Sequence, residues 1–186
     1  LNLKVAQEKK RLNGRVLVAP VVGRRRVLVV TDRREVVLYD VDPNNATGTP
    51  VVELGRLSSP NDQPMISYPL LEVGYAWVAN NRFSKYQLQA TSGKLASEWV
   101  LDEQDAYIAP LQLVRDVVIH VRRRQNASGV TVAATRTGDK DPSWQTEVAV
   151  PARGVFVQGE TVDKTVDIVT ARGRLFQAGA ADFQRG

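Results

Sequence analysis

The chain has 186 residues, a length typical of one domain, and 43% of them are hydrophobic while 24% are charged, as in an ordinary globular protein. It has no Cys and a single His, His120, which excludes a disulfide framework, a thiolate metal site, a Cys nucleophile and multi-histidine zinc sites. The formal net charge of +5 makes the chain only mildly basic. Val occurs 29 times and Ile only 4 times, and β-branched residues favour strands.

The sequence also bears on membrane segments and on the origin of the chain. No stretch approaches the ~20 apolar residues that a transmembrane helix needs, and no signal peptide is recognisable. Because the chain starts at Leu1 rather than Met, we expect an excised domain or a processed product of a larger protein.

Residues 1–13 precede the first repeated unit and allow two predictions. They suit a strand that pairs with the incomplete last repeat and closes a ring. Alternatively, the run Ala-Gln-Glu-Lys-Lys-Arg-Leu favours a short helix over Val5–Leu12. If the ring does not close, strand edges stay unpaired, and we expect self-association through them.

A repeat of 45 residues organises the rest of the chain. Gly48, Gly93 and Gly138 are spaced 45 residues apart, and each precedes a large apolar residue by six positions. In the second and third repeats that residue is Trp99 and Trp144. We expect each Gly to take a positive φ at a tight turn and each Trp to lie on an outer strand, packed against a neighbouring blade. About 45 residues is the length of a four-stranded propeller blade.

This spacing divides the single predicted domain into repeats over residues 14–57, 58–102, 103–150 and 151–186. The first three repeats each give four strands, and the fourth stops before its last strand. The fold we predict is therefore all-β, a propeller-like array of about four four-stranded antiparallel blades. The predicted strands are Ala19–Val22, Val27–Val30, Glu35–Val41, Val51–Leu54, Tyr68–Leu71, Tyr75–Ala79, Lys85–Gln89, the residues around Trp99, Ile108–Leu111, Val117–Val121, Val130–Ala134, the residues around Trp144, Val155–Val157, Val166–Thr170 and Leu175–Phe176.

The motifs of the repeats resemble a known family. Ala-Pro-Val-Val, Val-Leu-Val-Val-Thr-Asp and Leu-Tyr-Asp-Val-Asp, followed by a Gly and a later Trp, resemble the PQQ-like repeat over about residues 14–177. The resemblance implies a β-propeller like those of quinoprotein dehydrogenases and of the lipoprotein of outer-membrane-protein assembly. The first repeat departs from the pattern at Leu54, where Trp is expected. Because such propellers usually have seven or eight blades, we expect a fragment or half-propeller.

Motifs that could carry chemistry each fail at particular residues. Gly154–Thr161 has the spacing of a phosphate-binding loop, but Glu160 stands where the lysine is needed. Asp40–Val51 begins like a calcium loop but lacks the required Gly and Glu, so we interpret it as a turn. His120 lies in an apolar strand without a nucleophile motif nearby, so we interpret it as a structural histidine. The sequons that begin at Asn45 and Asn126 fall in predicted loops, and we do not expect glycosylation.

Two runs of arginine are the densest basic clusters. Successive residues of a strand point in different directions, so such a run is often only a solvated turn. The alternative is a basic rim that attracts an acidic partner, an anionic lipid surface or nucleic acid. Few aromatic residues flank the runs, which argues against nucleic-acid binding by base stacking. The candidate interaction residues are Arg24, Arg25, Arg26, Arg122, Arg123 and Arg124.

Together these observations favour a non-catalytic protein-binding or scaffolding domain of a larger bacterial protein. We expect no catalytic, cofactor-binding or metal-binding residues, and a protein or peptide partner rather than nucleic acid. The family resemblance alone favours a periplasmic or other extracytoplasmic location. Two alternatives stay open: a degenerate or truncated quinoprotein-type oxidoreductase domain, and a small β domain that binds nucleic acid or anionic surfaces through its Arg-rich loops.

Overall fold

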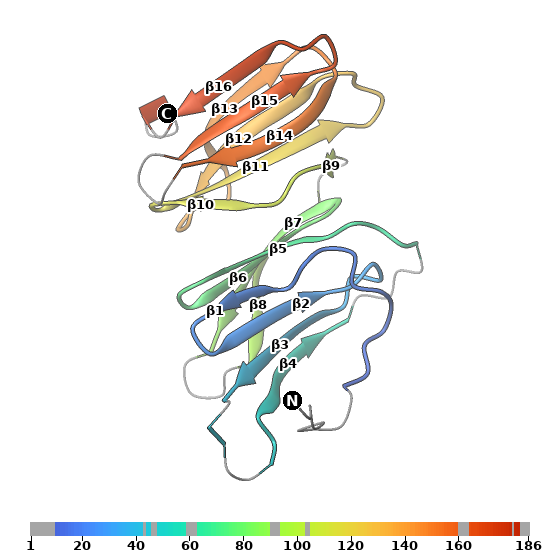
Figure 1. Cartoon of the computed structure of the whole chain (residues 1–186), viewed down its shortest axis with the longest axis vertical. Helices are drawn as coiled ribbons and strands as arrows, with labels where there is room; N and C mark the ends of the chain where they lie inside the picture. The colour runs from blue at the N-terminus through green and yellow to red at the C-terminus, as the bar shows by residue number, and fades with distance from the viewer. Residues whose placement is uncertain are drawn as a thin grey trace, which may run out of the picture. The chain divides into compact units, whose positions relative to one another are not determined.

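The strands of the chain form four successive sheets of three to five strands (Figure 1). The structure, a computed structural model, describes residues 10–42, 44–45, 48–58, 63–89, 94–102, 105–159, 164–179 and 181–182. The chain separates into two compact units, one of residues 1–78 with 84–98 and one of residues 79–83 with 99–186. Among the described residues, no helix is both long and apolar enough to cross a membrane.

The first, second and fourth sheets are meanders in which consecutive strands lie side by side, and in the third sheet β9 and β10 both pair with β11. The first sheet contains β1 (Val21–Gly23), β2 (Arg26–Val30), β3 (Val36–Val41) and β4 (Val51–Leu57). The second contains β5 (Tyr68–Glu72), β6 (Tyr75–Ala79), β7 (Arg82–Leu88) and β8 (Leu95–Asp102). The third contains β9 (Asp105–Tyr107), β10 (Gln112–Val114), β11 (Val117–Arg124), β12 (Val130–Arg136) and β13 (Pro142–Val148). The fourth contains β14 (Ala152–Gln158), β15 (Thr165–Thr170) and β16 (Leu175–Gly179).

This arrangement confirms the predicted fold class, an all-β propeller-like series of antiparallel blades. The fourth sheet has three described strands, as the sequence predicted for the incomplete last repeat. One predicted strand is wrong. Ile108–Leu111 is not a strand, and the edge of the third sheet is instead made by β9 and β10 on either side of it. Pro110 has no N–H to donate, so the hydrogen-bond ladder along β11 is interrupted there.

The core of the first unit lies between the first and second sheets. Leu28 and Leu38, which are cross-strand partners, contribute from the first sheet, and Ala76 and Leu88 contribute from the second. Alternation along a strand turns every second side chain to the same face. The Val-rich strands therefore bury one complete set of apolar side chains between these two sheets.

The opposite face of the first sheet is covered by residues near the N-terminus. Leu12 packs against a buried cluster that contains Val29 and Val37. The backbone N–H of Asn13 donates to Glu35 Oε2 at 2.7 Å. Residues 10–13 are neither strand nor helix, and they lie on the first sheet. The ring-closing strand and the helix predicted for this segment otherwise fall on residues 1–9, outside the described part of the chain.

The core of the second unit lies between the third and fourth sheets. Val132 and Ile119 contribute from the third sheet, and Val155, Val166 and Ile168 contribute from the fourth. Val155 is the cross-strand partner of Ile168, so the two side chains share the face that is turned to the core. Each unit therefore buries apolar side chains between a pair of successive sheets.

The residues that revealed the repeat lie on the predicted strands. Leu54, Trp99 and Trp144 are in β4, β8 and β13, the last strands of their sheets. Trp144 packs at the margin of the core that includes side chains of the fourth sheet, as expected for contact with a neighbouring blade. Gly48 takes a φ of +80°. Gly138 lies in the turn after β12 as predicted, but it has no positive φ, so that part of the prediction is wrong. Gly93 lies outside the described residues.

Candidate interaction surface

The first arginine run lies at the hairpin between β1 and β2. Arg24 takes a φ of +52° in the turn, and Arg25 is exposed. The Arg25 guanidinium Nη2 lies 2.8 Å from Asp40 Oδ2 and 3.1 Å from Asp42 Oδ2. Arg26, on β2, is the cross-strand partner of Asp40. Two carboxylates at the end of β3 thus offset part of the positive charge of this run.

The second arginine run lies at the end of β11, where it pairs with β9. Arg122 is largely buried, and its Nε lies 3.5 Å from Asp105 Oδ2 while its Nη2 donates to Gln145 Oε1 at 3.2 Å. Arg123 and Arg124 are exposed. Arg123 and Arg124 are therefore the residues of this run that are open to a partner.

His120 lies in an aromatic cluster of the second unit. Its side chain is 1% exposed, and its ring centroid lies 4.6 Å from that of Phe83 and 5.5 Å from that of Tyr107. Nε2 is 3.0 Å from Thr135 Oγ1. Burial, and secondarily the charge of Arg122, lowers the pKa of His120 to about 3. The histidine is neutral at pH 7 and is enclosed by side chains, which matches its interpretation as a structural residue.

A buried lysine is the feature that the sequence reasoning missed. Lys85 is 2% exposed, and its Nζ lies 2.9 Å from Glu98 Oε1 and 3.9 Å from the centroid of the Tyr75 ring. The Trp77 ring also lies beneath the ammonium, with its centroid at 5.4 Å. An ion pair and ring faces compensate the desolvation of the charge. The alternation of Tyr75 and Trp77 with Ala76 and Val78 could have indicated an aromatic face, but not its cation.

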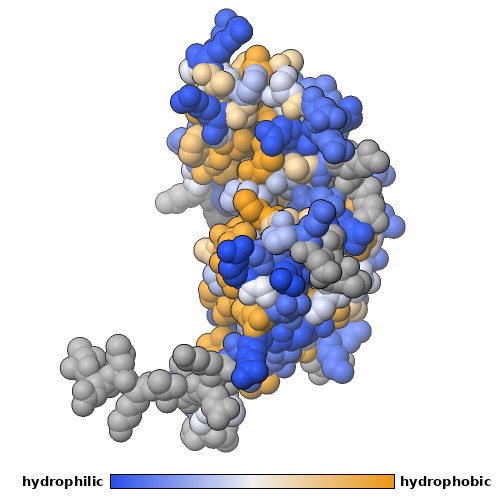
Figure 2. Space-filling model, turned by 90° about the vertical axis from the view of Figure 1, so that its right-hand side faces the viewer, coloured by the Kyte–Doolittle hydropathy of each residue, from blue (hydrophilic) through white to orange (hydrophobic). Residues whose placement is uncertain are grey.

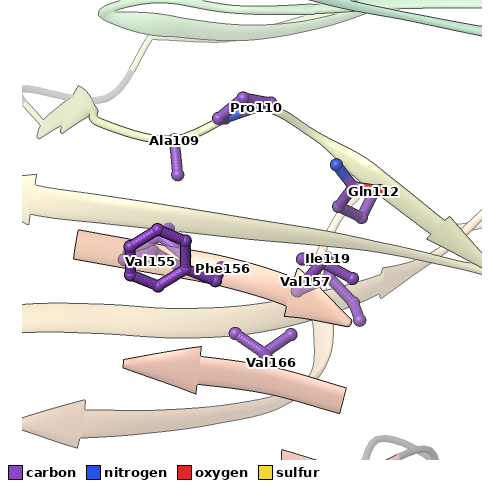
Figure 3. Close-up of a pocket in the computed structure, with 9 residues that line it drawn as sticks. Ala109, Pro110, Gln112, Ile119, Val155, Phe156, Val157 and Val166 are labelled. Atoms are coloured by element: carbon purple, nitrogen blue, oxygen red, sulfur yellow. The ribbon is translucent and has the colours of Figure 1, made fainter. Parts of the chain in front are cut away.

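Between the third and fourth sheets lies a small cavity of about 220 Å³ (Figure 3). Val157 and Val166 of the fourth sheet face Ile119 of the third sheet. Ala109, in the segment between β9 and β10, also lines the cavity. Gln112 is the only lining residue with a polar side chain. Within the described residues, no three His, Asp or Glu side chains are grouped to hold a metal ion. This cavity has no group that could act as an acid, a base or a nucleophile.

The weak motifs take ordinary structural roles where they are described. Residues of the loop-like segment that starts at Gly154 belong to strand β14, and Glu160 and Thr161 lie outside the described part. Asp40 and Asp42 contact Arg25 rather than forming a cation loop. Asn126 has a φ of +67° in the hairpin after β11.

Comparisons with known proteins give matches among solved structures only. No protein-family model matches the chain, and no curated protein matches it. Among solved structures, it is similar to the crystal structure of BamB from Moraxella catarrhalis, with 12% sequence identity and a TM-score of 0.44. The match covers 92% of this chain and 63% of that one, so the chain spans less than two thirds of its length. The fold is assigned from the strand order and register, and this similarity carries no part of the assignment.

Proposed function

We propose that the chain is a non-catalytic protein-binding or scaffolding domain. The observation that carries this proposal is the fourth sheet, which presents exposed apolar side chains beside a strand edge. Phe156 is 53% exposed and Leu175 is 60% exposed. Within the described residues, β16 pairs with β15 only. Exposed apolar side chains beside an open strand edge are typical of surfaces that bind protein.

The family resemblance adds two details to this proposal, a larger parent protein and an extracytoplasmic location. The PQQ-like motifs support a propeller piece of a larger, extracytoplasmic bacterial protein. The aromatic enclosure of His120 and the apolar lining of the cavity support a role other than catalysis. The alternative function is a quinoprotein-type oxidoreductase, and a test must distinguish it from the protein-binding role.

Site-specific photo-cross-linking tests the binding role. A photoreactive amino acid at Leu175, introduced in the source cell, should give a reproducible cross-linked protein. The matched control places it at Lys140, an exposed residue of the turn before β13. A product that contains only this chain would identify self-association. The absence of a specific product at position 175 would contradict the proposal.

The enzymatic alternative is tested by thermal unfolding with added pyrroloquinoline quinone and calcium. A ligand that binds only the folded state raises Tm as its concentration rises. We expect no change in Tm. A calcium-dependent rise in Tm, together with dye-linked turnover of an alcohol or sugar, would replace the binding role by the enzymatic one.

A further inference from the structure

The fourth sheet has two faces of different character. Ile168 pairs with Val155 on one side and with Phe176 on the other, and this set faces the core of the second unit. The next set, Gly154, Val169 and Leu175 in register, must lie on the opposite face. We call this opposite side the outer face of the sheet.

The outer face is apolar at the end where β14 begins. The Phe156 side chain belongs to it, because its cross-strand partner is Asp167, one position from Ile168. Phe156 lies on the edge strand β14 and also lines the cavity between the third and fourth sheets. A Cβ atom placed on Gly154 would lie 2.7 Å from atoms of the Phe156 ring, so the ring lies across Gly154. The ring and the exposed Leu175 therefore flank Val169 and form one apolar surface.

Three arginines border this apolar surface. Arg153 lies in the irregular register at the start of β14, and Arg172 and Arg174 lie in the turn between β15 and β16. The N–H of Ala171 donates to the carbonyl oxygen of Pro151 at 2.8 Å, which joins this turn to the start of β14. All three arginine side chains are exposed, and no ion pair with a described residue holds any of them.

Two carboxylates lie on or near this sheet, and neither forms an ion pair with the three arginines among the described residues. Asp167 shares the outer face, but it is buried and accepts a hydrogen bond from Gln177 Nε2 at 2.9 Å. Glu147 is exposed on β13, the strand that leads into Pro151. Figure 2 looks toward the side of the molecule where the turn between β15 and β16 lies, and its upper part shows strongly hydrophilic surface next to hydrophobic surface.

We propose that this basic–apolar corner, defined by Arg153, Phe156, Arg172, Arg174 and Leu175, binds an acidic protein segment that also carries apolar side chains. The proposal rests on the proposed protein-binding function and names the chemistry of the partner. Guanidinium groups bind carboxylates in a two-pronged geometry, and the neighbouring apolar surface receives aliphatic or aromatic side chains. Because the arginines are exposed, their charge also speeds the encounter with an acidic partner.

A protein segment fits this corner better than a nucleic acid does. Binding of single-stranded nucleic acid uses a basic groove with successive aromatic platforms for the bases. Here Phe156 is the only aromatic side chain of the corner, and its ring lies against the sheet at Gly154. Leu175 gives apolar contact but no ring face.

Fluorescence anisotropy of the full chain with a labelled peptide tests the proposal. The probe is a peptide that alternates glutamate with leucine, and the comparison peptides replace either every glutamate by lysine or every leucine by serine. We expect binding of the first peptide only, weakened about tenfold when salt rises from about 50 mM to about 250 mM. An equally charged single-stranded DNA serves as a competitor.

The decisive variant is Arg172→Glu with Arg174→Glu, compared with Arg136→Glu plus Lys140→Glu near the turn between β12 and β13. Both double variants change the net charge equally, and all four side chains are exposed. We expect the first to weaken peptide binding by at least about tenfold and the second by less than about twofold. Equal losses of peptide affinity in the two double variants would show that net charge alone controls binding, and would overturn the proposal.

Two further outcomes of the binding experiment would overturn the proposed acidic protein segment. Stronger binding of the DNA than of the peptide would replace the acidic protein segment by nucleic acid as the partner. No binding of the peptide at low salt would overturn the inference, while a cross-linked partner at Leu175 would still support the protein-binding function. Circular dichroism and Tm check that the variants fold, and Arg172→Ala with Arg174→Ala provides a milder variant for the same comparison.

Discussion

The first and fourth sheets differ in what covers their second face. In the first sheet, one face packs against the second sheet, and Leu12 and its neighbours cover the other. In the fourth sheet, one face packs against the third sheet, while Phe156 and Leu175 on the other are more than half exposed. Both sheets come from similar Val-rich repeats. In the first sheet, a short segment that precedes the repeats makes the second face part of a core.

Truncation of a core residue in the covered sheet should have the largest effect. Leu38 is fully buried in β3, so Leu38→Ala removes apolar contacts and leaves a cavity. We expect a loss of about 2–5 kcal/mol in the free energy of unfolding, measured by urea denaturation followed by circular dichroism. A loss no larger than that of an exposed residue would show that the face of the first sheet turned to the second sheet is not a packed core.

Acid should weaken the second unit before the first. The pKa of His120 is about 3 in the folded state, below its ordinary value of 6.5, because burial disfavours the charged form. Between these values the unfolded chain binds a proton that the folded chain does not, so stability falls as pH falls, by up to ~1.4 kcal/mol per pH unit. His120→Phe should flatten the dependence of Tm on pH in this window. An unchanged slope would contradict the burial of the ring.

The first unit should respond to acid at lower pH. The hydrogen bond from the Arg15 backbone N–H to Asp32 lowers the pKa of that carboxyl group, although burial opposes the shift. Its stabilising effect is complete above the unfolded pKa of ~3.9 and is lost as pH falls through the lower folded value. Asp32→Asn should therefore reduce Tm at pH 7 and flatten the Tm profile below about pH 4. A variant with the wild-type Tm at pH 7 would show that this contact does not hold residues 10–15 on the first sheet.

Truncation of an exposed residue in the bare sheet should have the smallest effect on stability. Leu175→Ala removes a side chain that is 60% exposed. We expect a change within about 0.5 kcal/mol in the free energy of unfolding, in the same urea experiment used for Leu38→Ala. The same variant should nonetheless weaken binding of the acidic peptide. A large destabilisation would mean that the outer face is part of a core.

Local patterns predicted the sheets well, because each strand depends on its own residues. Alternation and turn residues placed most strands, and the 45-residue spacing put Trp99 and Trp144 on the last strands of their sheets. The break at Pro110 could have been predicted too, since proline cannot donate to a ladder.

The surface could be predicted only in part, because its properties depend on contacts between distant residues. The runs of three arginines were visible in the sequence, yet Arg25 and Arg122 are held by Asp40 and Asp105. Neither pairing follows from spacing alone. The position of Leu12 against the first sheet is equally non-local.

The acylation rate of the buried Lys85 reports local opening of the first unit. Its amine lies over the face of the Tyr75 ring and against Glu98, so an acylating reagent can reach it only when this part of the sheet opens. The exposed lysines of the same chain react without such an opening. The ratio of the two acylation rates, read by mass spectrometry, therefore measures how often the second sheet opens around β7 under native conditions.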